Sequence, residues 1–312
     1  MPRVIQKGLS DDELVQFLQR LQSIGQDFWQ RNWRESMALP EDLPLHDHEA
    51  ITRFLLLRTL LNQQGDTNKV RELVRALFAA FKRQLLDEPL KVVSQFYEVL
   101  AVFYRVGGEK GAKIYRVGAL GGIKPLSLFL YRFAAFAFFI SGLDRLLYEI
   151  VEDKLQQGVH NLWAFFRDDP ILNGGWVGND PKAVRMLTNW LIWLFGAIWR
   201  KVDVNLEDTL MVVDGHVDKV FCRAGAVKTV VYEPQRPFII VAKDIRSGIE
   251  TLVKGAPQAI PMFVDEGAFT IAMNWCFETQ PNCAECPIRT ACLAGRGSDE
   301  HLRWSAYRQN LP

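Results

Sequence analysis

Four of the five cysteines in this sequence lie close together near its carboxyl end. They are separated by six, two and five residues, and they are Cys276, Cys283, Cys286 and Cys292. Four thiolates in one compact loop provide a tetrahedral set of soft ligands, suited to an iron–sulfur cluster or to zinc. Zinc ribbons use two short Cys-x₂₋₄-Cys pairs, whereas one short pair flanked by longer loops favours a larger [4Fe–4S] cluster. A zinc ion and a metal-free group of buried cysteines are the alternatives.

The cysteine spacing resembles the C-terminal loop of the endonuclease III branch of helix-hairpin-helix DNA glycosylases. Further segments similar to that superfamily occur in the family's order: a glutamine, a hairpin with a lysine, an aspartate and then the cysteines. The resemblance covers roughly residues 51–294. It implies a base-excision repair enzyme that everts a damaged base from the DNA duplex, cuts its N-glycosidic bond and carries a [4Fe–4S] cluster.

Asp214 stands in a Val-Asp-x-His-Val segment that is similar to the one bearing the catalytic aspartate of this superfamily. Breaking an N-glycosidic bond builds oxocarbenium character on the sugar, which a fixed carboxylate stabilises. Such a carboxylate can also orient or deprotonate the nucleophile. The competing interpretation is a plain N-cap of the helix that follows, and the two roles are compatible because a capped carboxylate is held rigidly.

Lys182 follows a stretch that looks like an extended helix-hairpin-helix turn, containing Gly175 and Gly178. In such turns backbone amides bind a DNA phosphate beside a helix N-terminus. By resemblance, Lys182 matches the Schiff-base lysine of the members that also cleave the abasic site. A solvated lysine or a phosphate contact is the alternative. Lys182 and Asp214 are 32 residues apart, as in the archaeal 8-oxoguanine DNA glycosylases, so an oxidised purine is the first expected substrate.

Two further segments carry candidate DNA contacts. Residues 60–67 resemble the family segment whose glutamine fills the gap left by the everted base, which makes Gln64 the first candidate and Gln63 the second. Asp265 and Phe269 match a Val-Asp-x-x-x-aromatic stretch and lie one helical turn apart, so they could read a base edge and stack on its face. A polar helix end and a core aromatic are the respective alternatives.

Hydrophobic periodicity predicts helices over most of the chain. A capping box at Ser10–Glu13 begins the first. The other expected helices cover residues 51–62, 70–85, 90–104, 126–151 and 186–199. The β-branched runs 227–232 and 238–242 predict one small hairpin. A glycine-rich basic segment, residues 105–124, is either a phosphate-tracking loop or a solvated one.

Composition narrows the class of protein. The chain has 312 residues, is 49% hydrophobic and has a net charge of +1, which excludes wholesale disorder and a basic tail protein that coats nucleic acid. The apolar stretch 125–143 contains Arg132 and predicts a buried helix rather than a membrane span. Without a secretory signal, we expect a cytoplasmic, nucleoid-associated monomer with no membrane contact. Cys222, outside the ligand set, is expected to be a small buried hydrophobe.

The expected fold class is all-α. By resemblance it has two domains: residues 49–205 form a helical barrel with the hairpin, and residues 1–48 plus 206–312 form a terminal domain that holds the cluster, with the DNA cleft between them. The expected function is a DNA glycosylase with abasic-site lyase activity on double-stranded DNA containing a damaged base. A non-catalytic damage- or structure-specific DNA-binding protein and a glycosylase of a modified nucleoside are the alternatives.

Overall fold

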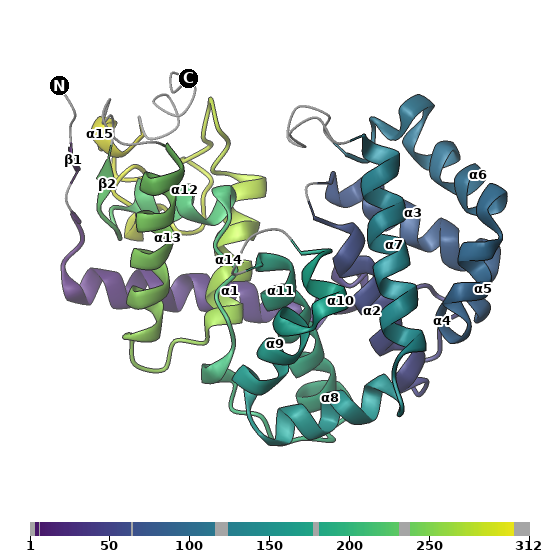
Figure 1. The fold of residues 1–312 in the computed structure, drawn as a ribbon. Helices are drawn as coiled ribbons and strands as arrows, with labels where there is room; N and C mark the ends of the chain where they lie inside the picture. The colour runs from purple at the N-terminus through teal and green to yellow at the C-terminus, as the bar shows by residue number, and fades with distance from the viewer. Residues whose placement is uncertain are drawn as a thin grey trace. The chain divides into compact units, whose positions relative to one another are not determined.

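The computed structural model describes residues 4–5, 7–63, 65–115, 124–176, 181–230 and 238–302. Within these ranges the chain is helical apart from one pair of two-residue strands (Figure 1). The expected all-α class is therefore confirmed.

The chain divides into two compact units. The terminal unit comprises Met1–Trp33 and Asn205–Pro312, and the central unit comprises Arg34–Val204. The first is therefore built from both ends of the chain and contains all four clustered cysteines, whereas the second contains the segment of the predicted hairpin and Lys182.

The terminal unit is a set of four longer helices with short connecting elements. A capping box begins α1, because the Ser10 amide donates to the Glu13 carboxylate at 2.8 Å and the Glu13 amide donates to the Ser10 hydroxyl at 3.3 Å. The elements are β1 (Val4–Ile5), α1 (Asp11–Ser36, which crosses the unit boundary), η4 (Leu206–Asp208), α12 (Gly215–Ala224), β2 (Thr229–Val230), α13 (Phe238–Lys254), α14 (Pro261–Asn274), η5 (Arg289–Ala291) and α15 (Asp299–Leu302).

The core of the terminal unit lies where α1, α12, α13 and α14 meet. Phe17 of α1 and Phe221 of α12 pack edge to face with ring centroids 5.3 Å apart. Helices α1 and α14 approach so closely that only glycine fits: a Cβ on Gly267 would lie 1.9 Å from the Leu21 carbonyl oxygen. This tight crossing fixes α14, the helix that carries Asp265 and Phe269.

The central unit is a group of helices packed around α2, which contacts α3, α4, α7, α8 and α11. Its elements are α2 (His48–Leu61), α3 (Thr67–Phe81), α4 (Gln84–Asp87), α5 (Pro89–Ser94), α6 (Phe96–Gly107), η1 (Glu109–Gly111), α7 (Pro125–Ser141), α8 (Leu147–Gln156), α9 (Val159–Asp168), α10 (Pro170–Asn173), α11 (Lys182–Ile192) and η3 (Trp193–Ile198, one turn of π-helix).

Helix α7 is the buried helix expected from its composition. It contacts α2, α5 and α10, and Phe129, Phe133 and Phe136 are fully or almost fully buried. Phe129 stacks on Phe103 of α6 with ring centroids 4.6 Å apart. No described helix is long and apolar enough to cross a membrane.

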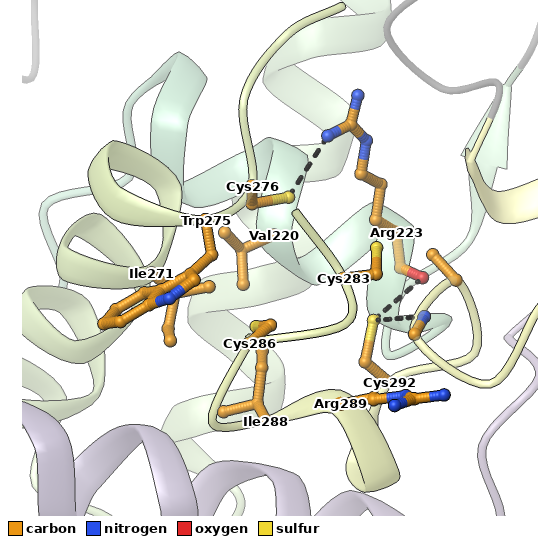
Figure 2. A pocket seen from close by; sticks show the side chains of 12 residues that line it. Val220, Arg223, Ile271, Trp275, Cys276, Cys283, Cys286, Ile288, Arg289 and Cys292 are labelled. Carbon is orange, nitrogen blue, oxygen red and sulfur yellow. Dashed lines mark hydrogen bonds between the residues drawn. The ribbon is translucent and has the colours of Figure 1, made fainter. Parts of the chain in front are cut away.

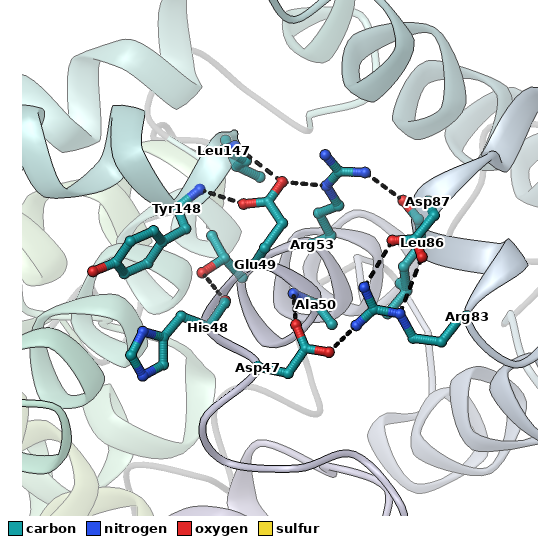
Figure 3. Close-up of polar contacts among 11 residues, drawn as sticks. Asp47, His48, Glu49, Ala50, Arg53, Arg83, Leu86, Asp87, Leu147 and Tyr148 are labelled. Carbon is teal, nitrogen blue, oxygen red and sulfur yellow. Dashed lines mark hydrogen bonds and ion pairs between the residues drawn. The ribbon is translucent and has the colours of Figure 1, made fainter. Parts of the chain in front are cut away.

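A polar network at the start of α2 joins three segments of the central unit (Figure 3). The Glu49 carboxylate accepts the Leu147 amide at 3.0 Å and the Tyr148 amide at 2.6 Å, and it also accepts from Arg53. Arg53 in turn donates to the Leu86 carbonyl at 2.8 Å. Glu49 thus satisfies the orphan amides at the start of α8.

That network explains one correction to the sequence analysis. A single helix was expected over residues 126–151, but α7 ends at Ser141 and α8 begins at Leu147. The new helix starts where Glu49, distant in sequence, accepts its first amides. Likewise, the helix expected over residues 186–199 begins earlier, at Lys182, and changes to a π-helix at Trp193.

The hairpin expected from residues 227–232 and 238–242 is wrong. Residues 238–242 belong to α13, and β2 pairs with β1 in antiparallel register, Val4 with Val230. Farther along α13, Ile245, Ile249 and Val253 recur at helical spacing and are buried in the core. Burial of this apolar stripe outweighs the β propensity of the preceding run.

The unit boundary also differs from the expected domain boundaries. Residues 34–48, placed with the terminal domain from the sequence, contact the central unit instead. Arg75 donates to the Ala38 carbonyl at 3.2 Å, and the Trp199 indole donates to the Leu45 carbonyl at 3.1 Å. These bonds to distant residues could not be read from the local sequence.

Candidate functional site

Asp214 is the N-cap of α12. Its Oδ1 accepts the His216 amide at 2.7 Å and the Val217 amide at 3.0 Å. The side chain is half-buried, and Oδ2 has no hydrogen-bond partner among the described residues. The carboxylate is therefore held rigidly by its N-cap bonds, which use only Oδ1. The other oxygen, Oδ2, remains available for a chemical role.

An aromatic side chain lies against His216, two residues after this aspartate. The Phe269 ring of α14 meets the His216 ring of α12 edge to face, with centroids 5.6 Å apart. Phe269 is 36% exposed, so it is not a core aromatic. Asp265, one turn earlier on α14, is half-buried. Sequence positions about fifty residues apart are thus brought together in the terminal unit by the packing of α12 on α14.

The hairpin region of the central unit is described only at its two ends. Gly175 is buried, and a Cβ there would lie 3.1 Å from a Leu60 methyl group, which favours glycine. Gly178 lies outside the described residues. Lys182 is half-buried at the first position of α11, directly after Pro181. A lysine at this position lies next to the free amides of a helix N-terminus.

Of the two glutamines predicted to contact DNA, the structure describes only Gln63. Gln63 is 8% exposed, and its side-chain amide donates to the Gly175 carbonyl at 2.9 Å and to the Leu60 carbonyl at 3.3 Å. Its side chain is therefore part of the interior, which argues against a direct contact with a base. Gln64 lies outside the described residues and stays a prediction.

The four cysteines surround one pocket in the terminal unit (Figure 2). Its apolar wall comes from α12, α14 and the cysteine loop, and two arginines also line it. The lining residues are Val220, Arg223, Ile271, Trp275, Cys276, Cys283, Cys286, Ile288, Arg289, Cys292, Ala294 and Gly295. Cys222 faces the hydrophobic core instead, as expected, so the four predicted ligands are separated from the fifth cysteine.

Arg223 ties α12 to the cysteine loop. It is 2% exposed and donates to the Phe277 carbonyl at 2.7 Å, to the Glu278 carbonyl at 2.9 Å and to the Cys276 sulfur at 3.2 Å. A guanidinium offers five donors in a rigid fork, which allows this three-way contact. The same helix therefore carries Asp214 at its start and a wall of the cysteine pocket at its end.

The thiols are set in a poorly solvated environment. Burial raises the pKa of Cys286 to about 11 and that of Cys292 to about 12, because a thiolate loses hydration there. Burial also raises the pKa of Cys283. Thiols of this kind bind a metal with release of their protons, and the metal charge then replaces water in stabilising the thiolates.

Among the residues described, no three cysteine, histidine or acidic side chains converge closely enough to hold one metal ion. Around zinc, with Zn–S bonds of about 2.3 Å, the sulfurs crowd one point, whereas in a [4Fe–4S] cube each thiolate binds a different iron. The arrangement of the four cysteines around one pocket suits the larger group.

Two residues at these places were not singled out from the sequence. His216 and Arg223 both lie on the helix that Asp214 begins. Their only sequence signal was their position on that helix, because the partners of both side chains are on α14 or in the loop after it.

No protein-family model matches the chain, and no curated protein matches its sequence significantly. The function therefore has to be argued from the motifs and from the geometry of the residues that bear them.

Proposed function

We propose that this protein is a base-excision DNA glycosylase of helix-hairpin-helix type with a [4Fe–4S] cluster and abasic-site lyase activity. The observation that carries the proposal is the arrangement along α12. The helix begins at a rigid, half-buried Asp214, its His216 contacts the Phe269 ring, and it ends at the four-cysteine pocket. Chemistry on a sugar needs the first feature, and the family's cluster needs the last.

Asp214 supplies the charge that the reaction needs. As the base departs with the bonding electrons, positive charge develops on the sugar, and a fixed carboxylate stabilises it without reorganising. The two amides held by Oδ1 keep the carboxylate in place and leave Oδ2 for the substrate side. The carboxylate also accepts a proton from the nucleophile.

Lys182 is the proposed nucleophile. Its neutral amine forms a bond to C1′ as the bond between C1′ and the base breaks, and the Asp214 carboxylate takes up a proton from the attacking nitrogen. The bond between C1′ and O4′ then breaks, O4′ takes a proton, and the imine so formed permits β-elimination of the 3′ phosphate. Lys182 belongs to the central unit and Asp214 to the terminal unit. The proposed nucleophile and the proposed carboxylate therefore come from different units of the chain.

The residues around the cysteine pocket fit a cluster with a structural role. Cys276, Cys283, Cys286 and Cys292 would hold the irons, and the bound cluster would supply a rigid cross-link of the loop. Arg223 then ties that loop to α12 through the carbonyls of Phe277 and Glu278. We infer that the cluster fixes the terminal unit rather than transferring electrons to substrate.

A panel of duplexes, each with one modified base, tests the proposal. Release of the base and nicking of the strand are scored separately. The spacing of Lys182 and Asp214 makes an oxidised purine the first lesion to include. We expect release from at least one duplex and none from undamaged DNA. Binding without release from any duplex would favour a non-catalytic DNA-binding protein, and faster release from the free nucleoside would favour a nucleoside enzyme.

A further inference from the structure

Three segments of the central unit that the sequence marks as DNA contacts meet at one place. The first segment is the end of α2, which leads to Gln64. The second is the described part of the basic segment, residues 105–115, and the third is α10, which leads into the predicted hairpin. Gly65 forms an antiparallel bridge with Tyr115, and the Asp66 amide donates to the Ile114 carbonyl at 2.8 Å. Gly65 and Asp66, which follow position 64, are therefore bonded to the start of the basic segment.

Gln63, which precedes position 64, is bonded to a different segment. The Gln63 side chain donates to the Gly175 carbonyl at 2.9 Å, across 112 residues of sequence. Both groups are buried, so water does not compete for this bond. The two neighbours of position 64 are thus anchored to two different segments.

Helix α7 contacts the end of α2 and the turn that follows it through a buried arginine. Arg132, 1% exposed, donates to the Gln63 carbonyl, and the Tyr115 hydroxyl donates to the Leu61 carbonyl at 2.9 Å. The Arg132 guanidinium also lies 5.7 Å from the centre of the Tyr115 ring. Burial raises the pKa of Tyr115 to about 12, so its hydroxyl stays a donor at neutral pH.

The preceding residue of α7, Tyr131, lies close to Gly174, which comes before the predicted hairpin. Tyr131 is 53% exposed, and its hydroxyl would lie 2.2 Å from a Cβ placed on Gly174. Helix α7 therefore contacts the turn through Arg132 and Gly174 through Tyr131. A single rigid helix sets the distance between the two.

We propose that Arg132, Gln63 and Tyr115 form a buried brace that fixes the end of α2 relative to Gly175, so that the predicted DNA contacts that follow each of them engage damaged duplex DNA together. The inference rests on the proposed function. The three are positioning residues: they touch neither DNA nor the reacting sugar, and they act through the backbone of residues 61–63 and 175.

The test uses a duplex containing tetrahydrofuran, an analogue of the abasic product whose binding does not depend on the lesion. The measured quantity is the ratio of affinities for this duplex and for an undamaged duplex. In the wild type we expect a clear preference for tetrahydrofuran. Arg132→Met removes the donor while keeping the length of the side chain, and we expect the preference to fall about tenfold with affinity for undamaged DNA unchanged. A merely structural defect would lower both affinities together.

Tyr115→Phe is the milder second variant, since it removes only the hydroxyl, and we expect a smaller loss of preference. Arg145→Gln is the control, because Arg145 is exposed on the same unit and pairs only with Asp153 and Glu149 among the described residues. If Arg132→Met does not fold, Tyr115→Phe decides. Wild-type preference in the folded variants would overturn the brace and leave the proposed function intact. No preference in the wild type would overturn both.

Discussion

Asp214 and Phe269 define the chemistry available in the terminal unit. One is a rigid carboxylate with an oxygen that accepts no hydrogen bond from the described residues, and the other is a partly exposed ring that contacts His216 on the same helix. A sugar losing its base needs the carboxylate, and an everted base needs a flat apolar surface. Neither residue is needed for the core, so both can be changed without unfolding the protein.

Phe269→Ala should weaken discrimination of damaged from undamaged duplex by about tenfold, because stacking of a base on an aromatic ring is lost. Met273→Ala is the matched control: Met273 lies one turn later on α14 and is 49% exposed. Competition binding with the panel duplexes measures both. Equal effects of the two substitutions would show that Phe269 contributes only apolar surface.

Lys182→Ala should abolish the covalent protein–DNA adduct that borohydride traps, because no imine forms without the amine. Lys91→Ala, on the same unit and exposed at the surface, should leave the adduct unchanged. Gel analysis of the trapped species gives the result. An adduct that persists without Lys182 would mean that another amine is the nucleophile.

The helices set these side chains through two kinds of contact: a close crossing of α1 with α14 and the packing of α14 on α12. The crossing depends on Gly25 and Gly267, each of which faces a backbone carbonyl of the opposite helix. Because α14 carries Phe269, any shift at the crossing moves the candidate site.

Gly267→Ala should lower the free energy of unfolding by about 2–3 kcal/mol, since the new methyl group would overlap the Leu21 carbonyl. Gly248→Ala on α13 is the control: nothing lies within 4 Å of a Cβ there, so we expect a gain of about 0.5–1 kcal/mol from helix propensity. Urea denaturation measures both. A neutral Gly267→Ala would contradict the tight crossing.

The cysteine loop is the element on which the proposed cluster is tested. Cys283→Ala should lose the absorbance band near about 400 nm and most of the bound iron, which in the wild type should be about four per chain. Cys222→Ala should keep both, because Cys222 faces the core. Zinc in place of iron in protein purified without air would contradict the [4Fe–4S] assignment.

Some elements could be predicted from the sequence because their signals are local. The capping box before α1 and the buried helix α7 depend on residues a few positions apart. Other features depend on distant partners. Residues 238–242 are helical, Glu49 starts α8, and Gln63 faces the interior because Gly175 offers it a carbonyl.

The molecule as a whole separates its proposed groups between two units. The acid, the aromatic ring and the cysteines belong to the terminal unit, and the lysine, the hairpin and the brace belong to the central unit. The order of the motifs along the sequence predicted this grouping. The boundary near residue 34 could not be predicted, because it depends on bonds from residues 38 and 45 to helices far along the chain.

The rate of base release by Asp214→Asn, measured in a single turnover on the best duplex of the panel, tests the central claim most directly. Asparagine still accepts the two amides at the start of α12, so the fold and the affinity for duplex should be unchanged. Without the negative charge, we predict that release slows about a thousandfold. Release at the wild-type rate by the folded variant would contradict the assignment of Asp214 as the catalytic carboxylate, and with it the glycosylase mechanism proposed for this protein.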